Sequence, residues 1–312
     1  MTPRPTTGRS LGVRACAKIN LTLRVLGVRA DGYHDIRTVF QSVALCDRLR
    51  FERSRGPFRI SSDDPGCPTD RSNLVWQAAD EVWRASGRRS RPSGVHVHIH
   101  KGIPARAGLG GGSSDAAVAL RAFSALWSRR LEPDRLMAIA ARLGADVPFF
   151  LVGGTALGVD RGDRLFPLVD RPTAWVVIAQ PDVGVATAEA YRWLDADREV
   201  RSGRRRPARA GLGVALGPYG EGGNDFQGLV ERRHPVVRQV ATVLRSAGAE
   251  WAAMSGSGSA VFGLFSSRPD AEIAAGRVSG LVRTTLVTRT LSAREYRRRS
   301  ALRDLPGGEP FD

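Results

Sequence analysis

The sequence predicts an α+β protein of two domains, and three observations lead to this prediction. The 312 residues exceed what one hydrophobic core usually fills and suggest two domains of about 150 residues each. Patterns with the period of strands and of helices occur in both halves of the chain. A glycine-rich segment, Pro104–Asp115, leads directly into a helical pattern. Such a loop places backbone N–H groups and a helix N-terminus around an anion.

The composition is that of a globular protein, with 42% hydrophobic and 25% charged residues. The longest clean apolar stretch, Ala174–Ala179, is far shorter than the ~20 residues that cross a bilayer. Residues 1–12 lack the apolar region of a secretory signal and are expected to be disordered. Cys16, Cys46 and Cys67 form neither a CxxC pair nor an even set for disulfides, which favours a reducing compartment. We therefore expect a cytoplasmic protein.

The formal net charge is +16, and only two of the 47 basic residues, Lys18 and Lys101, are lysines. An ammonium group is compact, whereas a guanidinium is a broad fork, so the two lysines are candidates for roles that arginine cannot fill. The charge suits nucleic acid or a polyphosphate substrate, but no RNP, KH or zinc-finger pattern accompanies it. Most of it is expected on solvated faces, including poorly ordered segments at Arg198–Arg209 and from Arg294 onward.

The elements of the first half follow from hydrophobic periodicity and turn residues. A turn is expected at Arg29–Gly32, and Asp70 or Ser72 is available as a helix cap. The expected strands are Val13–Leu26, Ile36–Leu45, Leu49–Glu52, Phe58–Ser61 and Gly94–Ile103, and the expected helices are Asn73–Ser86, Ala116–Trp127 and Pro133–Leu143.

Three histidines, His96, His98 and His100, alternate with apolar residues on the strand Gly94–Ile103 and share one face of it. Three imidazoles could bind a metal, but no Cys, Asp or Glu cluster accompanies them. An exposed strand face is the favoured interpretation.

The glycine-rich segment Pro104–Asp115 fits neither of the two common phosphate loops. A Walker A loop needs Lys directly after the last glycine, and here Ser113 and Ser114 follow Gly112. A Rossmann loop needs a different glycine spacing near the start of the domain. A flexible linker would not lead at once into an amphipathic helix. We therefore expect a phosphate-chain site of another type.

Asp146 lies in the apolar stretch that follows Gly144. Because Pro148 suits a first helical turn, Asp146 is either a helix cap or a working carboxylate, and spacing alone leaves both open.

The second half has the same alternation of strands and helices, with a second Gly/Ser turn at Ser255–Ser259. The expected strands are Trp175–Ala179, Trp251–Met254, Ala260–Phe265 and Thr284–Leu291, and the expected helices are Thr187–Leu194, Pro235–Ser246 and Pro269–Val282.

Three segments together resemble the GHMP family of small-molecule kinases: Ala17–Leu21, the loop Pro104–Ala116 and Met254–Ala260. Further segments, in the same order along the chain, are similar to one branch of this family. That branch phosphorylates the 2-hydroxyl of a cytidine-diphosphate-linked methylerythritol in the non-mevalonate route to isoprenoid precursors. These segments are Ala17–Leu23, Arg29–His34 with Gln41, Ala145–Phe150, Gly153–Gly154 and Arg161–Gly162.

The resemblance implies a first domain like ribosomal protein S5 domain 2, a ferredoxin-like second domain and an active site in the cleft between them. On this basis we expect domains at 13–168 and 169–293, followed by a basic tail at 294–312. The resemblance implies that Asp146 is the catalytic base and that Lys18 is its partner. It also implies a substrate site at Asn20, Tyr33, His34 and Asp146. In this site Tyr33 would stack on cytosine and His34 would hydrogen-bond the edge of the base. The implied ATP site comprises Asn73, Leu74, Lys101, Pro104, Ala105, Arg106, Ala107, Gly108, Leu109, Gly110, Gly111, Gly112, Ser113 and Ser114.

The implied cofactors are ATP and Mg²⁺, the metal being held by the ATP phosphates with help from Ser114 or Asp115. The implied partners are the two small-molecule substrates, with neither nucleic acid nor membrane, and the chain is expected to be a monomer or a weak homodimer. Two departures from the family pattern are Cys16 in place of Pro and Gln227 in place of a carboxylate. The alternatives are another GHMP kinase, of homoserine or mevalonate type, and an RNA-binding protein on the S5-like fold.

Overall fold

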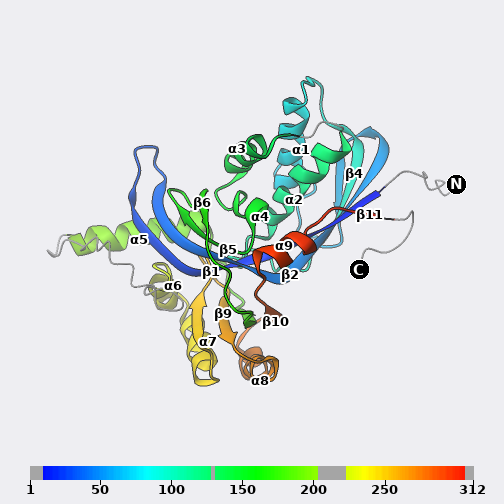
Figure 1. Ribbon diagram of the computed structural model, residues 1–312. Helices are drawn as coiled ribbons and strands as arrows, with labels where there is room; N and C mark the ends of the chain where they lie inside the picture. The colour runs from blue at the N-terminus through cyan, green and yellow to red at the C-terminus, as the bar shows by residue number, and fades with distance from the viewer. Residues whose placement is uncertain (1–9, 128–130, 203–222, 306–312) are drawn as a thin grey trace.

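The computed structural model describes residues 10–127, 131–202 and 223–305 (Figure 1). Within these residues it contains a seven-stranded sheet and a four-stranded sheet, each packed against helices. The larger sheet has the order β11, β1, β2, β4, β3, with β5 joined to β2 and β6 joined to β5. Its strands are β1 (Ser10–Val28), β2 (His34–Pro57), β3 (Arg59–Ser62), β4 (Ser93–His100), β5 (Thr155–Val159), β6 (Arg164–Pro167) and β11 (Arg303–Leu305).

β1 and β2 form one long antiparallel ribbon, longer than the sequence predicted. The expected separate strand Leu49–Glu52 is a continuation of β2, because its pairing with β1 extends from Ser10 opposite Glu52 to Val28 opposite His34. The register shifts between Cys16 and Lys18 and again between Asn20 and Thr22. Such bulges bend a strand and redirect its side chains.

The β1–β2 ribbon contributes to three hydrophobic cores. Val13 packs with the helices of the first half, Ile19 packs against the four-stranded sheet, and Val25 packs with helices of the second half. The ribbon therefore joins both halves of the molecule.

The helices of the first half are α1 (Leu74–Ala85), α2 (Gly111–Leu126), α3 (Pro133–Leu143) and α4 (Phe149–Val152). The cap of α1 is Asn73, whose side chain accepts from Val75 N, and neither Asp70 nor Ser72 has this role. Helix α2 begins five residues before the predicted Ala116. Gly111 and Gly112 can be helical here because the first turn has no intrahelical N–H bonds to lose.

The second half contains β7 (Trp175–Gln180), β8 (Trp251–Met254), β9 (Val261–Phe265) and β10 (Thr284–Arg289), in the sheet order β10, β7, β9, β8. Its helices are α5 (Thr187–Ser202), α6 (Gln227–Arg233), α7 (Pro235–Ser246) and α8 (Arg268–Val278), followed by a 3₁₀ turn at Ser279–Leu281. Helix α5 extends past the predicted end at Leu194, and the rest of the arginine-rich segment, 203–209, lies outside the described residues.

Residues 293–305 correct the expectation of a poorly ordered basic tail. They form α9 (Ala293–Arg299) and β11, which pairs with β1 at the first sheet (Figure 1). Ser292 and Glu295 form a capping box, and the buried Tyr296 donates from Oη to the Phe150 carbonyl at 2.7 Å. One apolar anchor and a good cap outweigh the charge of the segment. Residues 10–12, expected to be disordered, form the start of β1.

The structure shows the surroundings of the cysteines and of the three strand histidines. Cys16 and Cys46, opposite each other on β1 and β2, form a disulfide, which corrects the expectation of three unpaired cysteines. The pairing depends on strand register, which cysteine spacing does not reveal. His96 and His98 both bond Ser61, and the described residues contain no group of three or more His, Cys, Asp or Glu arranged for a metal ion. Within the same residues, no helix has the length and apolarity needed to cross a membrane.

Candidate active site

Lys18 lies at the centre of the candidate site, on β1 between the two register shifts. Its Nζ donates to Asn20 Oδ1 at 2.6 Å and lies 3.3 Å from Asp146 Oδ2. The residue is 3% exposed, and its ammonium group lies 5.5 Å from the centre of the Phe40 ring. A buried ammonium needs such partners to offset the cost of leaving water. Lys18 therefore presents a fixed positive charge to Asp146.

The structure excludes one of the two interpretations of Asp146, that of a helix cap. Helix α4 begins after Pro148, with no side chain capping it, so Asp146 is not its cap. Its carboxylate is directed at Lys18 and keeps 34% of its side-chain surface exposed. A carboxylate that is both ion-paired and open to solvent can accept a proton from a bound molecule.

Asn20 is oriented by a chain of hydrogen bonds to β2. Its Nδ2 donates to Thr38 Oγ1 at 2.7 Å, and Thr38 Oγ1 donates to the Thr22 carbonyl at 2.7 Å. Since the amide nitrogen is used in this way, the amide oxygen faces Lys18. Thr38 was not found from the sequence, because it orients Asn20 only through the pairing of β1 with β2, which brings Thr38 next to Thr22, 16 positions earlier in the chain.

The glycine-rich loop at 104–110 is held by three groups from different parts of the fold. Lys18 N donates to the Leu109 carbonyl at 3.0 Å, and Gln180 Nε2 donates to the Ala105 carbonyl at 3.1 Å. Ser255 Oγ donates to the Gly108 carbonyl at 2.9 Å. The loop is thus fastened to β1, to β7 and to the Gly/Ser turn after β8.

That turn was identified in the sequence but given no role in the site. In the structure Ser255 Oγ also accepts from Asn20 N at 3.3 Å. Asn224 Nδ2 holds the turn by donating to the carbonyls of Met254 and Gly256 at 2.8 and 2.7 Å. The alternating Ser and Gly residues at 255–259 could have indicated this role in the sequence, because glycine lets one backbone segment lie close to another.

The close approach between this turn and the loop predicts opposite effects for two glycine substitutions. A Cβ on Gly108 would lie 2.1 Å from the Ser255 carbonyl oxygen, at a φ of +73°, whereas a Cβ on Gly112 would meet nothing within 4 Å. We expect Gly108→Ala to lower the free energy of unfolding by about 2–4 kcal/mol. We expect Gly112→Ala, in the first turn of α2, to raise it by about 0.5 kcal/mol. Urea unfolding monitored by circular dichroism measures both, and equal stability of the two variants would contradict the close approach.

The N-terminal turn of α2 suits an anion, but two of its side chains are turned inward. Ser114 Oγ is fully buried and donates to the Cys16 carbonyl at 2.8 Å. Asp115 is 3% exposed and lies beneath the helix start, bonded to Lys101. Neither side chain is arranged to ligate magnesium, so the expected help from Ser114 or Asp115 does not fit this geometry.

Lys101 differs from Lys18 in its surroundings. Its Nζ donates to Asp47 Oδ2 and, at 2.9 Å, to Asp115 Oδ2. Asp47 is fully buried and also accepts from the N–H groups of Gly102 and Ile103 at 2.7 Å. The two carboxylates keep the pKa of Lys101 above its ordinary value although burial opposes this, and burial together with the Asp47 charge raises the pKa of Asp115 to about 8. Lys101 therefore ties β2 to α2, and its predicted contact with ATP stays a prediction.

A second group of side chains lies beside Asp146, at the start of β2 and on α5. His34 Nε2 is 2.8 Å from Asp195 Oδ1, and the His34 ring stacks on Tyr191 with centroids 4.4 Å apart. Burial and then the charges of Asp146 and Asp195 raise the pKa of Tyr191 to about 12. The charges of Asp146 and Asp195 thus both influence the Tyr191 hydroxyl, so α5 lies next to the candidate site. Tyr191 and Asp195 were not found from the sequence, which placed Tyr191 within the expected helix Thr187–Leu194 and Asp195 just beyond its end.

Tyr33 and the pair Asn73 and Leu74 have simpler surroundings. The Tyr33 ring is 58% exposed, with the Arg161 guanidinium carbon 5.2 Å from its centre, which leaves aromatic surface for a ligand. Asn73 caps α1 and Leu74 begins that helix, and no described contact joins either of them to the glycine-rich loop.

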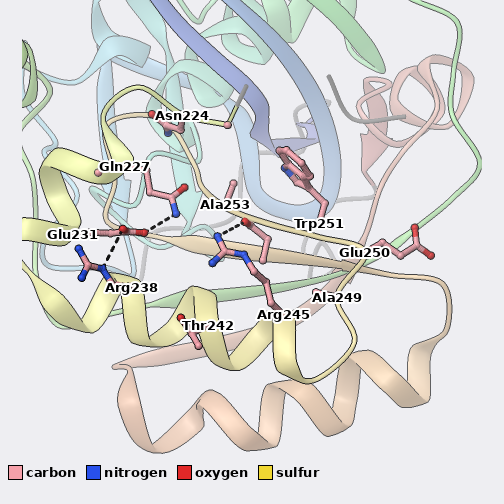
Figure 2. A pocket seen from close by; sticks show the side chains of 13 residues that line it. Asn224, Gln227, Glu231, Arg238, Thr242, Arg245, Ala249, Glu250, Trp251 and Ala253 are labelled. Atoms are coloured by element: carbon pink, nitrogen blue, oxygen red, sulfur yellow. Dashed lines mark hydrogen bonds and ion pairs between the residues drawn. The ribbon is translucent and has the colours of Figure 1, made fainter. Parts of the chain in front are cut away.

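A cavity of ≈ 860 Å³ lies between α6, α7 and the edge strand β8, and its lining includes Asn224 but none of the site residues predicted from the sequence (Figure 2). Its polar side chains bond one another or the β8 backbone: Arg238 with Glu231, Gln227 with Glu231, and Arg245 with the Ala252 carbonyl. These contacts cover the open edge of the sheet.

Comparison with known proteins agrees with this geometry. The model of the GHMP kinase N-terminal domain matches residues 73–154, and that of the GHMP kinase C-terminal domain matches residues 208–282. The 4-diphosphocytidyl-2-C-methyl-D-erythritol kinase of Moorella thermoacetica is 41% identical over 90% of this chain and 99% of its own. That of Pelotomaculum thermopropionicum is 40% identical over 90% and 98%.

Solved structures give the same result. A crystal structure of 4-(cytidine 5'-diphospho)-2C-methyl-D-erythritol kinase matches with a TM-score of 0.72 and 35% identity, covering 89% of this chain and 98% of the other. The homoserine kinase from Cytophaga hutchinsonii matches with a TM-score of 0.66 at 17% identity, covering 98% and 99%, which is a likeness of fold.

Proposed function

This chain belongs to the 4-diphosphocytidyl-2-C-methyl-D-erythritol kinases of the GHMP family, and from that membership we propose the reaction and the role of each residue. The reaction is transfer of the γ-phosphoryl group of ATP to the 2-hydroxyl of 4-diphosphocytidyl-2-C-methyl-D-erythritol, giving the 2-phosphate and ADP. It belongs to the non-mevalonate pathway of isoprenoid precursor biosynthesis. The observation that carries the proposal is the Lys18–Asp146 ion pair of 3.3 Å beside the glycine-rich loop.

In the proposed mechanism Asp146 accepts the proton of the 2-hydroxyl as that oxygen attacks the γ-phosphorus. Lys18 aims the carboxylate at the hydroxyl, because its ammonium is held by Asn20 on the other side. Phosphoryl transfer needs mainly positioning and charge stabilisation, and a compact ammonium supplies charge without clamping both carboxylate oxygens as a guanidinium would.

ATP is the co-substrate, and residues 104–114 are the proposed cradle for its phosphates. The N–H groups at the start of α2 and the positive end of the helix favour the phosphate chain. Since Ser114 and Asp115 face inward, we assign magnesium to the phosphates of ATP itself. We place Asn73, Leu74 and Lys101 at the nucleotide end of this cradle. We keep 13–168 and 169–293 as the proposed domain limits.

For the second substrate, we assign Asn20, Tyr33 and His34 to binding, with Tyr33 as the stacking surface for cytosine. Homoserine and mevalonate lack a nucleobase, so the aromatic group at Tyr33, His34 and Tyr191 favours the cytidine substrate over theirs. An RNA-binding role would leave the Lys18–Asp146 pair without a purpose.

The direct test is an assay of the purified chain with ATP, magnesium and 4-diphosphocytidyl-2-C-methyl-D-erythritol, with the 2-phosphate identified by mass spectrometry. Homoserine and mevalonate serve as control acceptors. Equal turnover of either control would refute the proposed substrate.

Asp195 is expected to set the hydrogen bonding of His34. If the Asp195 carboxylate accepts from Nε2–H, Nδ1 remains an acceptor, which suits the amino group of cytosine. Because Asp195 is 39% exposed, we expect Asp195→Asn to raise the KM for the cytidine substrate only about three- to tenfold and to leave the KM for ATP unchanged. Asp197→Asn is the control, because Asp197 lies on the same helix and pairs with Arg232 instead. Equal changes in both KM values would argue against a role at the base.

A further inference from the structure

A series of three rings leads from the candidate substrate site into the core of the second half. His34 stacks on Tyr191 with ring centroids 4.4 Å apart and an angle of 23° between the ring planes. The Tyr191 ring meets the Phe226 ring edge to face, with centroids 4.9 Å apart and an angle of 86°. Edge-to-face contact is one of the two arrangements that aromatic rings prefer. Phe226 therefore supports the ring on which His34 stacks.

The position of Phe226 is set by hydrogen bonds between β1 and the residues just before it. Asp225 N donates to the Leu23 carbonyl at 2.9 Å, and Asp225 Oδ2 accepts from Val25 N at 2.9 Å. The Phe226 side chain is 1% exposed and lies in the core that β1 shares with α5, α6 and α7. Since β1 also carries the lysine of the candidate site, Phe226 is fixed relative to that site.

Tyr191 depends more on its ring neighbours. It lies on α5, where Ala190 and Leu194 are the buried apolar side chains among the described residues. The described ring contacts of Tyr191 are those with His34 and Phe226. A smaller side chain at position 226 would leave space beside the Tyr191 ring, and a ring that is no longer packed can change its rotamer. The surface on which His34 stacks would then be lost.

We propose that Phe226 is a positioning residue for the cytidine substrate, because its ring keeps Tyr191 in the orientation on which His34 stacks. This rests on the proposed role of His34 in binding that substrate. Phe226 acts through two other rings and does not itself contact the base. The glycine-rich loop is fastened by other side chains, among them Gln180 and Ser255. The effect of Phe226 should therefore be confined to the cytidine substrate.

Steady-state kinetics of the full chain tests this proposal. We expect Phe226→Leu to raise the KM for the cytidine substrate about three- to tenfold, the loss of one aromatic pair, and to leave kcat and the KM for ATP within a factor of about two. Tyr191→Leu should raise the same KM, and adding Phe226→Leu to it should have no further effect, because the contact is already lost. Where Phe226→Leu does not fold, Phe226→Met keeps more of the core volume and serves in its place.

Phe265→Leu is the matched control for loss of core packing. Phe265 is also 1% exposed and belongs to the same hydrophobic core, but no ring contact among the described residues joins it to Tyr191. It should lower the urea midpoint of unfolding without changing the KM for the cytidine substrate. An unchanged KM in Phe226→Leu, an equal rise in Phe265→Leu, or additive effects of the Tyr191 and Phe226 changes would each overturn the proposal.

A second measurement needs no substrate. The ring protons of His34, assigned by their loss from the NMR spectrum of His34→Gln, are expected to be shifted by the Tyr191 ring. They should move in Phe226→Leu and keep the parent's chemical shifts in Phe265→Leu, and an unmoved signal in Phe226→Leu would overturn the proposal. The two proposals thus fail separately, because a parent chain without turnover of the cytidine substrate would refute the proposed function and leave this result in place.

Discussion

Replacing Asp146 by Asn is expected to lower kcat by about 10²–10⁴-fold, the range typical of a lost general base. An amide cannot take the proton of the attacking hydroxyl, yet it has nearly the shape of the carboxylate. Because the Asp146 side chain is 34% exposed, we expect little change in folding stability, and because the amide keeps the shape of the carboxylate, both KM values should change much less than kcat. Steady-state kinetics of phosphoryl transfer, with thermal unfolding of the same sample, measures these effects.

Asp134→Asn is a matched control, since Asp134 is an exposed carboxylate in the first turn of α3. It should retain the kcat of the parent. If Asp146→Asn kept kcat within a factor of about ten of the parent, Asp146 would not be the base, and Lys18 would have to be reconsidered as a purely structural charge.

The second large effect is expected on stability, for Lys101→Met. This change removes the single ammonium that lies between Asp47 and Asp115, which are 0% and 3% exposed. Loss of one partner from a buried ion pair typically costs about 3–5 kcal/mol, because it leaves buried charge without compensation. We expect a loss of this size at pH 8, measured by urea unfolding.

The loss should grow as the pH rises above about 8. The pKa of Asp115 in the folded protein is about 8, above its ordinary value of 3.8, so folding favours its protonated form and stability from this group decreases as the pH rises from about 4 through 8. Removing the Lys101 cation raises that pKa further, so above pH 8 the variant keeps a proton on Asp115 that the parent releases, and its stability continues to fall while that of the parent levels off. Adding Asp115→Asn to Lys101→Met should recover part of the loss at pH 8. A loss that is independent of pH, with no recovery in the double variant, would contradict this account.

Most of the longer helices and strands were predictable from local sequence, although α6, α9 and β11 were not. Helices α3 and α7 and strand β8 have the predicted bounds, because their periodicity and their flanking Pro or Gly residues are unambiguous. The start of α2 was placed five residues too late, since glycine argues against helix while the first turn tolerates it. Helix α9 was missed because three arginines in its last turn outweighed one buried Tyr296 in the sequence pattern.

The structure brings Lys18, Asn20 and Asp146 together as the resemblance implied, although 126 residues separate Asn20 from Asp146. Local sequence could not predict the residues that contact these three side chains or lie beside them. Thr38, Tyr191 and Asp195 owe their positions to strand pairing and to the packing of α5 near the β1–β2 ribbon. The disulfide between Cys16 and Cys46 has the same origin, since its two residues meet only through register.

The β1–β2 ribbon has a mechanical consequence for catalysis. A hinge between two domains needs a few residues that can change their backbone angles freely, but here two strands remain paired, through three register shifts, from one core to the other. Swinging the domains apart would require breaking that ladder close to Lys18. We therefore expect substrate to enter and product to leave through movement of loops and side chains, while Lys18, which lies within the paired strands, keeps its position.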